Sequence, residues 1–348
     1  MTYRRLSSLL IALCLSTQAF GQSTDSLRHP SELHLRNIRQ LTFGGTNAEA
    51  YFSHDFTRFS FQSSREPYGC DQIFAMNVDG SDQRLVSTGK GVTTCAYFLP
   101  GDSRVVYAST HASSPDCIPR PDKSKGYLWG VYGAYDLYTV NVDGSDLRVL
   151  SATPFYDAEA TVSPVGDRIV FTSSRDGDLE LYTMNIDGSD VRRITNDLGY
   201  DGGAFFSWDG KRLVYRGHHP TDSASQAEYR ALLAEQLVRP TRMEIFTSDA
   251  DGSNRRQLTN NGAANFAPFF HPSDQKIVFS SNVIDPRGRT FHVYLMNDDG
   301  SKLEQITYGG SFNSFPMFSR DGSKVVFVSD RNAKGRYEFN VFTADWVE

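Results

Sequence analysis

A six-residue segment, Asn77–Asp82 (Asn-Val-Asp-Gly-Ser-Asp), returns along the chain at nearly regular intervals. Its four further copies lie at Asn141–Asp146, Asn185–Asp190, Asp249–Asn254 and Asn297–Lys302. Each copy follows a short aromatic-rich run and precedes a short apolar run, and an Asp-Gly pair between two such runs is a strong signal for a β-hairpin. The repeat is therefore the unit that decides what this chain can fold into.

A second repeated segment lies upstream of most Asp-Gly turns and consists of an apolar strand, a tight turn and another apolar strand. Its six copies are Ala50–Arg65, Ala96–His111, Ala160–Arg175, Ala204–His218, Pro268–Asn282 and Pro316–Arg331. Together the two segments give four short antiparallel strands in a unit of about 40 to 45 residues, which is typical of a propeller blade. The sequence predicts an all-β, six-bladed β-propeller, with insertions at 112–134 and 220–242 in the two longest repeats.

The two ends of the repeat array predict how the ring closes. The last repeat stops after its third strand, without an Asp-Gly turn. Ile38–Thr42, in contrast, resembles an isolated fourth strand that stands before the first repeat. We expect this N-terminal strand to complete the sixth blade, so that residues 38–348 form one propeller domain.

The repeated turn of the Ser-Pro-Asp-Gly type, the strand ending in Ser-Ser-Arg and the Tyr-x-Met-Asn-x-Asp-Gly-Ser segment resemble the TolB-type (WD-repeat-like) six-bladed β-propellers of bacteria. The resemblance covers residues 38–346 and implies the same fold. TolB itself carries a separate α/β domain before its propeller, whereas here the short segment 22–37 follows the expected leader.

The first 21 residues have the pattern of a secretory signal peptide. Arg4 and Arg5 form the charged start, Leu6–Leu15 the apolar run and Ala19–Gly21 a small-residue cleavage site. The apolar run is too short to span a bilayer, so we expect a periplasmic or secreted protein that is not inserted into a membrane. The net charge of −6, with no run of Lys or Arg, argues against a nucleic-acid partner.

The first strand of each blade should begin, and the second strand should end, at the same end of the channel. Polar residues at these strand ends are therefore expected to form a ring around one mouth, which is the predicted ligand site. The side chains expected around this mouth are Glu49, Arg65, His111, Asp157, Glu159, Arg175, Asp201, His218, Asn265 and Arg331. Both insertions should lie above the same mouth, with helical periodicity at Ala227–Val238. A polar ring under two lids favours ligand binding. The alternative is that the arginines form structural ion pairs with Glu49, Glu159 and their neighbours.

Three cysteines follow the leader: Cys70, Cys95 and Cys117. In an oxidising compartment they favour one disulfide and one free thiol, and the sequence leaves the pair open. A zinc site of the three cysteines with His111 is the alternative, although their spacing matches no compact zinc motif. We expect neither a metal nor a cofactor.

The sequence contains no Gly-x-Ser-x-Gly, His-Glu-x-x-His, phosphate-loop or dinucleotide motif. Asp249–Asn254 resembles the start of a calcium loop but lacks the distant bidentate Glu, and its recurrence favours a turn. The favoured function is a non-catalytic, monomeric scaffold that binds a protein or peptide at the mouth. The alternative is a hydrolase or lyase acting on carbohydrate or peptide through the mouth carboxylates and His111 or His218.

Overall fold

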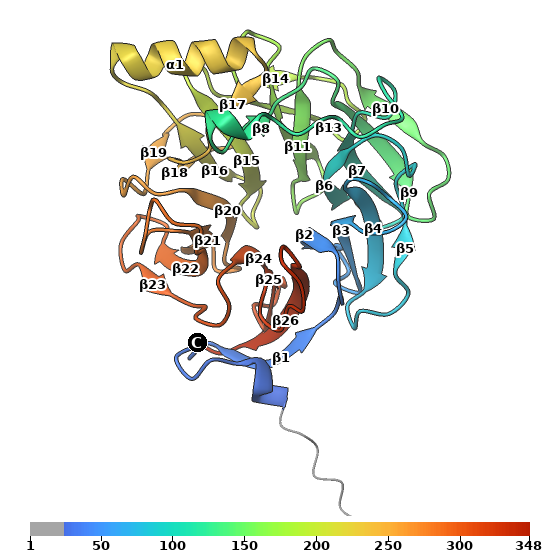
Figure 1. Ribbon diagram of the computed structural model, residues 1–348, viewed down its shortest axis with the longest axis vertical. Coiled ribbons are helices and arrows are strands. Elements are labelled where there is room, and N and C mark those ends of the chain that lie inside the picture. The colour runs from blue at the N-terminus through green and yellow to red at the C-terminus, as the bar shows by residue number, and fades with distance from the viewer. Residues whose placement is uncertain (1–23) are drawn as a thin grey trace, which may run out of the picture.

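The computed structural model describes residues 24–348, which form a ring of six four-stranded antiparallel sheets (Figure 1). The predicted all-β, six-bladed propeller is confirmed. The predicted signal peptide, residues 1–21, lies outside the described residues.

Blades 1 to 3 follow one another along the chain. Blade 1 contains β2 (Thr46–Phe52), β3 (Arg58–Ser64), β4 (Gln72–Asn77) and β5 (Arg84–Leu85). Blade 2 contains β6 (Thr93–Phe98), β7 (Arg104–Ser109), β9 (Asp136–Asn141) and β10 (Arg148–Ser151). Blade 3 contains β11 (Asp157–Val162), β12 (Arg168–Ser173), β13 (Glu180–Asn185) and β14 (Arg192–Arg193).

Blades 4 to 6 complete the ring. Blade 4 contains β15 (Tyr200–Phe206), β16 (Arg212–His218), β18 (Glu244–Asp249) and β19 (Arg256–Gln257). Blade 5 contains β20 (Asn265–Phe270), β21 (Lys276–Ser281), β22 (His292–Asn297) and β23 (Glu304–Gln305). Blade 6 contains β24 (Asn313–Phe318), β25 (Lys324–Ser329), β26 (Asn340–Trp346) and β1 (Leu35–Gln40). Two short 3-10 helices lie outside the blades, η1 (Thr24–Leu27) and η2 (Lys123–Lys125).

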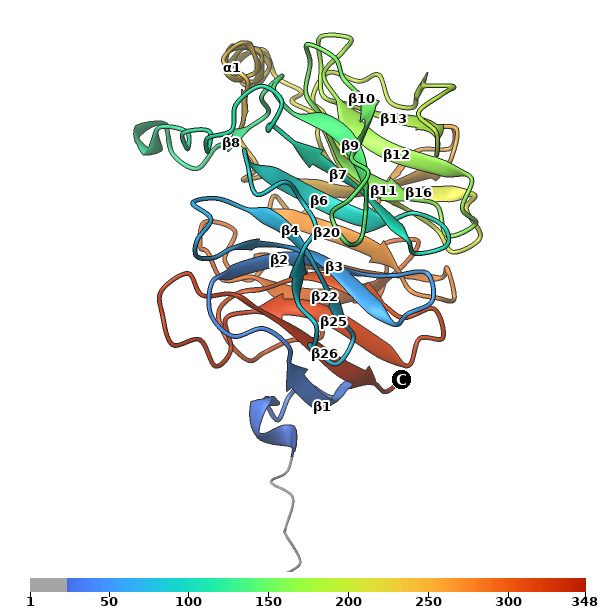
Figure 2. The same cartoon turned by 90° about the vertical axis from the view of Figure 1, so that its right-hand side faces the viewer.

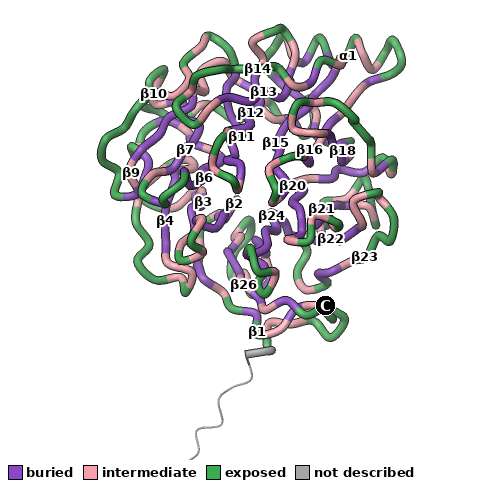
Figure 3. The backbone as a smooth tube through the Cα atoms, turned by 180° about the vertical axis from the view of Figure 1, so that it is seen from behind, coloured by how far each residue is buried: buried purple, intermediate pink, exposed green. Residues whose placement is uncertain are grey.

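The second strand of each blade supplies many of the most deeply buried side chains. Fully buried examples are Phe59, Phe61, Tyr107, Phe171, Tyr215, Phe279 and Phe327. These strands are apolar on both faces because each blade packs between two others, and the buried segments accordingly follow the strands in Figure 3. Burial of each such side chain stabilises the fold by roughly 1.5–3 kcal/mol.

One residue in the first strand of every blade adopts a left-handed backbone conformation. The six residues are Glu49, Cys95, Glu159, Gly203, Ala267 and Phe315, with φ between 48° and 59°. The pairing between the first and second strands shifts its register across each of these positions, as in a β-bulge. All six residues line the central cavity, so the bulge turns one residue of each blade toward the channel.

The Asp-Gly turns bring neighbouring blades into close contact. Their glycines have φ between 83° and 87°, which glycine adopts without steric cost. A Cβ atom at Gly252 would lie 2.2 Å from the carbonyl oxygen of Ile194 in the preceding blade. Ser253 N–H donates to Asp251 Oδ1 at 2.9 Å, so Asp249–Asn254 forms a turn between β18 and β19, as predicted.

The N-terminal strand closes the ring, as the sequence predicts. β1 pairs antiparallel with β26, with Leu35 opposite Trp346 and Arg39 opposite Thr343. The strand spans Leu35–Gln40, a few residues earlier than the predicted Ile38–Thr42. Leu41 N–H still donates to the carbonyl oxygen of Val341, so the pairing continues past the end of the strand.

The two insertions meet above one end of the ring and form what we call the lid. β8 (Trp129–Gly130) of the first insertion pairs antiparallel with β17 (Leu237–Val238) of the second. The helix α1 (Ser223–Ala234) begins four residues before the predicted Ala227–Val238, because Asp222 caps its N-terminus and Leu237–Val238 is a strand instead. Figure 2 shows α1 and the segment around β8 on the same side of the ring. Within residues 24–348, no helix is long and apolar enough to cross a membrane.

Candidate binding site at the lidded mouth

A small cavity of about 20 Å³ lies in the channel between the bulge residues. Its lining includes Glu49, Cys95, Glu159 and Arg216, which belong to blades 1 to 4. A volume of this size holds about one water molecule, far less than a substrate needs. The cavity itself is therefore too small to hold a ligand larger than water.

Glu159 and Arg216 form the centre of a buried polar cluster in this channel. The Arg216 guanidinium donates to Glu159 Oε1, and Tyr200 O–H donates to Glu159 Oε2 at 2.8 Å. Thr172 O–H and Gly203 N–H donate to the same carboxylate at 2.7 and 3.0 Å. A Cβ atom at position 203 would lie 2.0 Å from Arg216 Nη1, so glycine leaves the space that the guanidinium occupies. These donors fix the position of the Glu159 carboxylate, which makes it a structural partner of Arg216.

Glu49 differs from Glu159, because its Oε2 is buried and makes no hydrogen bond within the described residues. Burial raises the pKa of Glu49 to about 7, while a hydrogen bond from Cys95 and the charge of Arg216 oppose that rise. Burial and the neighbouring Glu49 and Glu159 raise the pKa of the Cys95 thiol well above its usual value. Cys95 is thus a protonated thiol that lacks the thiolate character of a nucleophile or metal ligand.

Most of the other predicted mouth residues are engaged within their own blades. Arg65 donates to Asn47 Oδ1 at 2.8 Å, and Arg175 donates to both oxygens of Asp157 at 3.0 and 3.1 Å. Their guanidinium groups also lie over aromatic rings, which adds a cation–π attraction. The arginines therefore pair with the residue two positions before the bulge, and not with Glu49 or Glu159. The bulge explains this, since it turns the two glutamates into the channel.

Blade 6 uses a partner from outside the ring. Arg331 donates to both carboxylate oxygens of Glu32 at 3.2 and 2.8 Å and to Asn313 Oδ1 at 3.1 Å. Both members of this ion pair are almost fully buried. Burial alone would raise the pKa of Glu32, but Arg331 and the N–H groups of Gly309 and Tyr308 lower it below the usual value. The N-terminal segment thus supplies the carboxylate of Glu32, which pairs with Arg331 of blade 6.

The remaining predicted residues are placed as follows. His219, one residue beyond the predicted His218, is the residue that contacts Asp201, with Nε2 3.0 Å from Asp201 Oδ1. His219 lies two residues beyond Gly217, the cross-strand partner of Asp201, just as Arg175 lies two residues beyond Ser173, the partner of Asp157. His111 contacts Ser109, and Asn265 is buried against Ser281.

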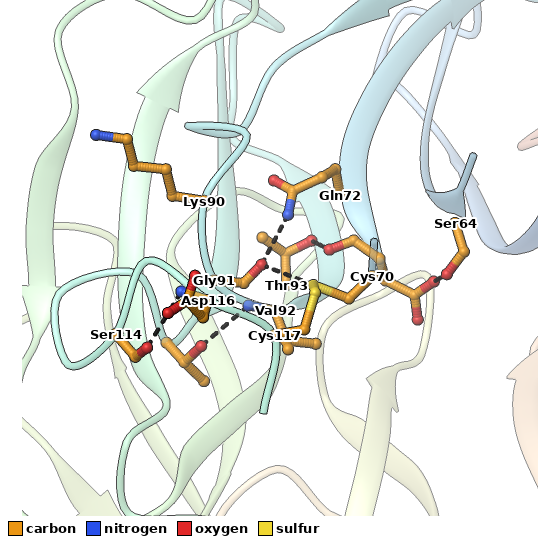
Figure 4. The surroundings of a disulfide bond; sticks show 12 residues. Ser64, Cys70, Gln72, Lys90, Gly91, Val92, Thr93, Ser114, Asp116 and Cys117 are labelled. Carbon is orange, nitrogen blue, oxygen red and sulfur yellow. Dashed lines mark hydrogen bonds between the residues drawn. A yellow bond between two sulfur atoms is a disulfide. The ribbon is translucent and has the colours of Figure 1, made fainter. Parts of the chain in front are cut away.

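Cys70 and Cys117 form a disulfide that ties the first insertion to blade 1, as Figure 4 shows. Among the cysteines of residues 24–348, Cys95 is the free one, and it lies in the channel. Two of the three thiols of the alternative zinc set are therefore linked to each other.

The lid covers the polar cluster with an aromatic side chain. The Trp129 ring of β8 lies over the Arg216 guanidinium, with 5.2 Å between the carbon of that group and the ring centroid. The same ring contacts Tyr200 and Phe266, with centroid separations of 6.5 and 5.2 Å. Trp129 thus connects the charged half of the channel to blade 5.

From Trp129 a row of rings continues around blades 5 and 6 to the edge of blade 1, and we call it the aromatic arc. It consists of Trp129, Phe266, Phe291, Phe312 and Phe339. Successive centroids are 5.2, 5.5, 6.0 and 4.5 Å apart, and every ring is half-buried. The sequence prediction missed the arc. Phe291, Phe312 and Phe339 each immediately precede a first or third strand, so alignment of those positions would have revealed it.

These features define a class of protein, a six-bladed β-propeller whose channel mouth is covered by two paired insertions. Residues 229–346 match the family model of the TolB beta propeller domain. This stretch lies in blades 4 to 6, and it matches the family that the repeated motifs resemble. No curated protein matches it in sequence.

Solved structures share this fold at low sequence identity. The TolB structure from Agrobacterium tumefaciens is 18% identical, with a TM-score of 0.58, and the match covers 87% of this chain and 91% of that one. TolB from Acinetobacter baumannii is 18% identical, with a TM-score of 0.55 and coverage of 86% and 63%. An oligogalacturonate lyase from Vibrio parahaemolyticus is 13% identical, with a TM-score of 0.55 and coverage of 88% and 79%. At these identities the likeness concerns the fold, which hosts both binding proteins and enzymes.

Proposed function

We propose that this chain is an exported, non-catalytic TolB-like propeller that binds a protein or peptide at its lidded mouth. The observation that carries the proposal is the position of the exposed aromatic side chains. Those of the described residues are Phe43, Tyr127, Phe155, Tyr308 and Tyr337, and all five lie on loops of this mouth. Aromatic residues are enriched at protein interfaces, where their large rings supply much of the binding energy.

Two further features agree with this function. Arg175, Arg216 and Arg331 each pair with a carboxylate, and the channel cavity is too small for a substrate. The Cys70–Cys117 disulfide suits the oxidising cell envelope or exterior that an exported protein would meet.

A pull-down from periplasmic extract tests the proposal. We expect the wild-type protein to enrich a partner that a Tyr127→Ser/Phe155→Ser variant loses. The matched control is Val165→Ser/Ile186→Ser, which removes exposed apolar side chains from turns at the opposite end of the blades. If all three proteins captured the same partners, the mouth would not be the binding surface.

A hydrolase or lyase acting on carbohydrate or peptide is the second candidate. The observation that favours it is Glu49, because a carboxyl group with a pKa of about 7 suits general acid–base catalysis at neutral pH. Turnover of a carbohydrate or peptide panel by the wild type, lost in Glu49→Gln at unchanged melting temperature, would favour the enzyme over the binding scaffold.

A further inference from the structure

Four exposed basic side chains lie on the two loops that lead to Phe291 and Phe339 of the aromatic arc, and we call them the basic rim. They are Arg287, Arg289, Lys334 and Arg336, on the loops that join β21 to β22 and β25 to β26. Within the described residues none of the four forms an ion pair, although Arg336 lies over the Tyr337 ring at 4.8 Å. The chain as a whole has a net charge of −6, so a group of free cations beside an apolar surface is a local exception.

The carboxylates of the same two loops are mostly directed at the backbone. Asp330 accepts from the N–H groups of Ser311 and Phe312 at 2.8 and 3.0 Å. Glu338 accepts from Lys334 N–H and Gly335 N–H at 2.9 and 3.0 Å. Asp285 is the one carboxylate of these two loops that is exposed, whereas Asp330 and Glu338 are half-buried. The side chains available to a ligand are therefore mainly cationic.

The structure supplies both parts of a docking surface over blades 5 and 6. The aromatic arc offers half-buried apolar rings, and the basic rim offers cations that can meet carboxylates at the edge of the contact. Charge complementarity at an interface rim selects the partner and speeds association, while apolar anchors at the centre supply affinity.

We infer that the partner segment is an acidic peptide with at least one aromatic or large aliphatic side chain, bound along the aromatic arc with its carboxylates on the basic rim. This inference rests on the proposed function and names the chemistry of the partner. A peptide fits better than an anionic sugar chain, because one ring pair of the arc is stacked and the others are tilted or edge-on to each other, which leaves no continuous flat surface for pyranose rings.

Selection from a phage-displayed random dodecapeptide library tests the inference. Three proteins are compared: the wild type, the reversal variant R287E/R289E/K334E/R336E, and the control variant K211E/R256E/K302E/R320E. The control changes four exposed basic residues outside the mouth loops. We expect wild-type and control proteins to select peptides with net negative charge and an aromatic residue. A synthetic copy of a selected peptide should bind the reversal variant at least about tenfold more weakly than it binds the wild type. Its affinity for the wild type should fall as salt is added.

The outcomes separate this inference from the function on which it rests. Equal affinity of the selected peptides for wild type and reversal variant would overturn the acidic-partner inference and leave peptide binding at the mouth intact. Binding of polygalacturonate in place of any peptide would overturn it as well. Failure to select a peptide together with failure to capture a partner in the pull-down would overturn the proposed function itself.

Discussion

At the scale of single residues, one left-handed position per blade decides the chemistry of the channel. Glu49, Cys95 and Glu159 adopt this conformation. It is unfavourable for residues other than glycine and costs about 1–2 kcal/mol for each of them. Because the bulge recurs in every blade, changing the side chain at one position changes the channel lining without changing the blade. The sequence uses this freedom to place acids in blades 1 and 3 and the apolar Phe315 in blade 6.

The raised pKa of Glu49 predicts how stability depends on pH. A carboxyl group whose pKa is higher in the folded chain binds more protons when folded, so its contribution is full below about pH 4.5 and is lost as the pH rises through about 7. Glu180, also with a pKa raised to about 7, acts in the same direction. The unfolding free energy of the wild type should therefore decrease from pH 5 to pH 8. In Glu49→Gln we expect this decrease to be smaller by up to about 3 kcal/mol.

Urea denaturation at several pH values measures this effect. Asp116→Asn, at an exposed carboxylate in the first insertion, is the control and should leave the wild-type slope unchanged. A Glu49→Gln protein with the full wild-type pH dependence would contradict the assignment.

The sequence predicted which strand ends lie at the mouth, and its alternative paired the arginines with Glu49, Glu159 and their neighbours. In the structure the partners are the neighbours Asn47 and Asp157, two residues before each bulge. A bulge adds a residue to one strand without a strong sequence signal, so pattern alone could not reveal the shift. The aromatic arc was missed for a related reason: its rings come from five loops and strand ends, and only the closed ring brings them together.

At the scale of elements, the lid is held at two separate points. β8 pairs with β17, and Cys117 is bonded to Cys70 in blade 1, 47 residues away in sequence. The sequence predicted both insertions above one mouth, but short strands such as Leu237–Val238 carry too little pattern to be separated from the neighbouring helix. Pairing between the two insertions makes the lid one unit.

Removing the disulfide should loosen this unit. We expect Cys70→Ser/Cys117→Ser to lower the free energy of unfolding by about 2–4 kcal/mol, because the unfolded chain regains the freedom that the cross-link removes. Limited proteolysis should also cut within 112–134 sooner than in the wild type. Wild-type protein treated with reductant is the matched control and should behave like the variant. Unchanged cleavage of the insertion in the variant would show that β8–β17 pairing alone fixes the lid.

At the scale of the whole molecule, the N-terminal segment holds blade 6 in two ways. β1 completes its sheet, and Glu32 neutralises the buried Arg331. The sequence predicted this strand because the last repeat lacks its fourth strand, while a segment resembling a fourth strand precedes the first repeat. It gave no sign of the ion pair, since Glu32 lies outside the repeats and meets Arg331 only when the ring closes.

Deleting residues 22–43 from the leaderless chain removes both contacts. The deletion leaves β26 as an exposed sheet edge and Arg331 as a buried charge without its carboxylate. We expect the truncated protein to be cleaved faster throughout blade 6 and to self-associate. Its melting temperature should be lower than that of the full chain by clearly more than a degree or two. Glu32→Gln keeps the strand but removes the charge, so its stability should lie between those of the full chain and the truncated protein. We expect its free energy of unfolding to fall by about 3–5 kcal/mol. A truncated protein that melts within a degree or two of the full chain would mean that the ring holds together without its N-terminal strand.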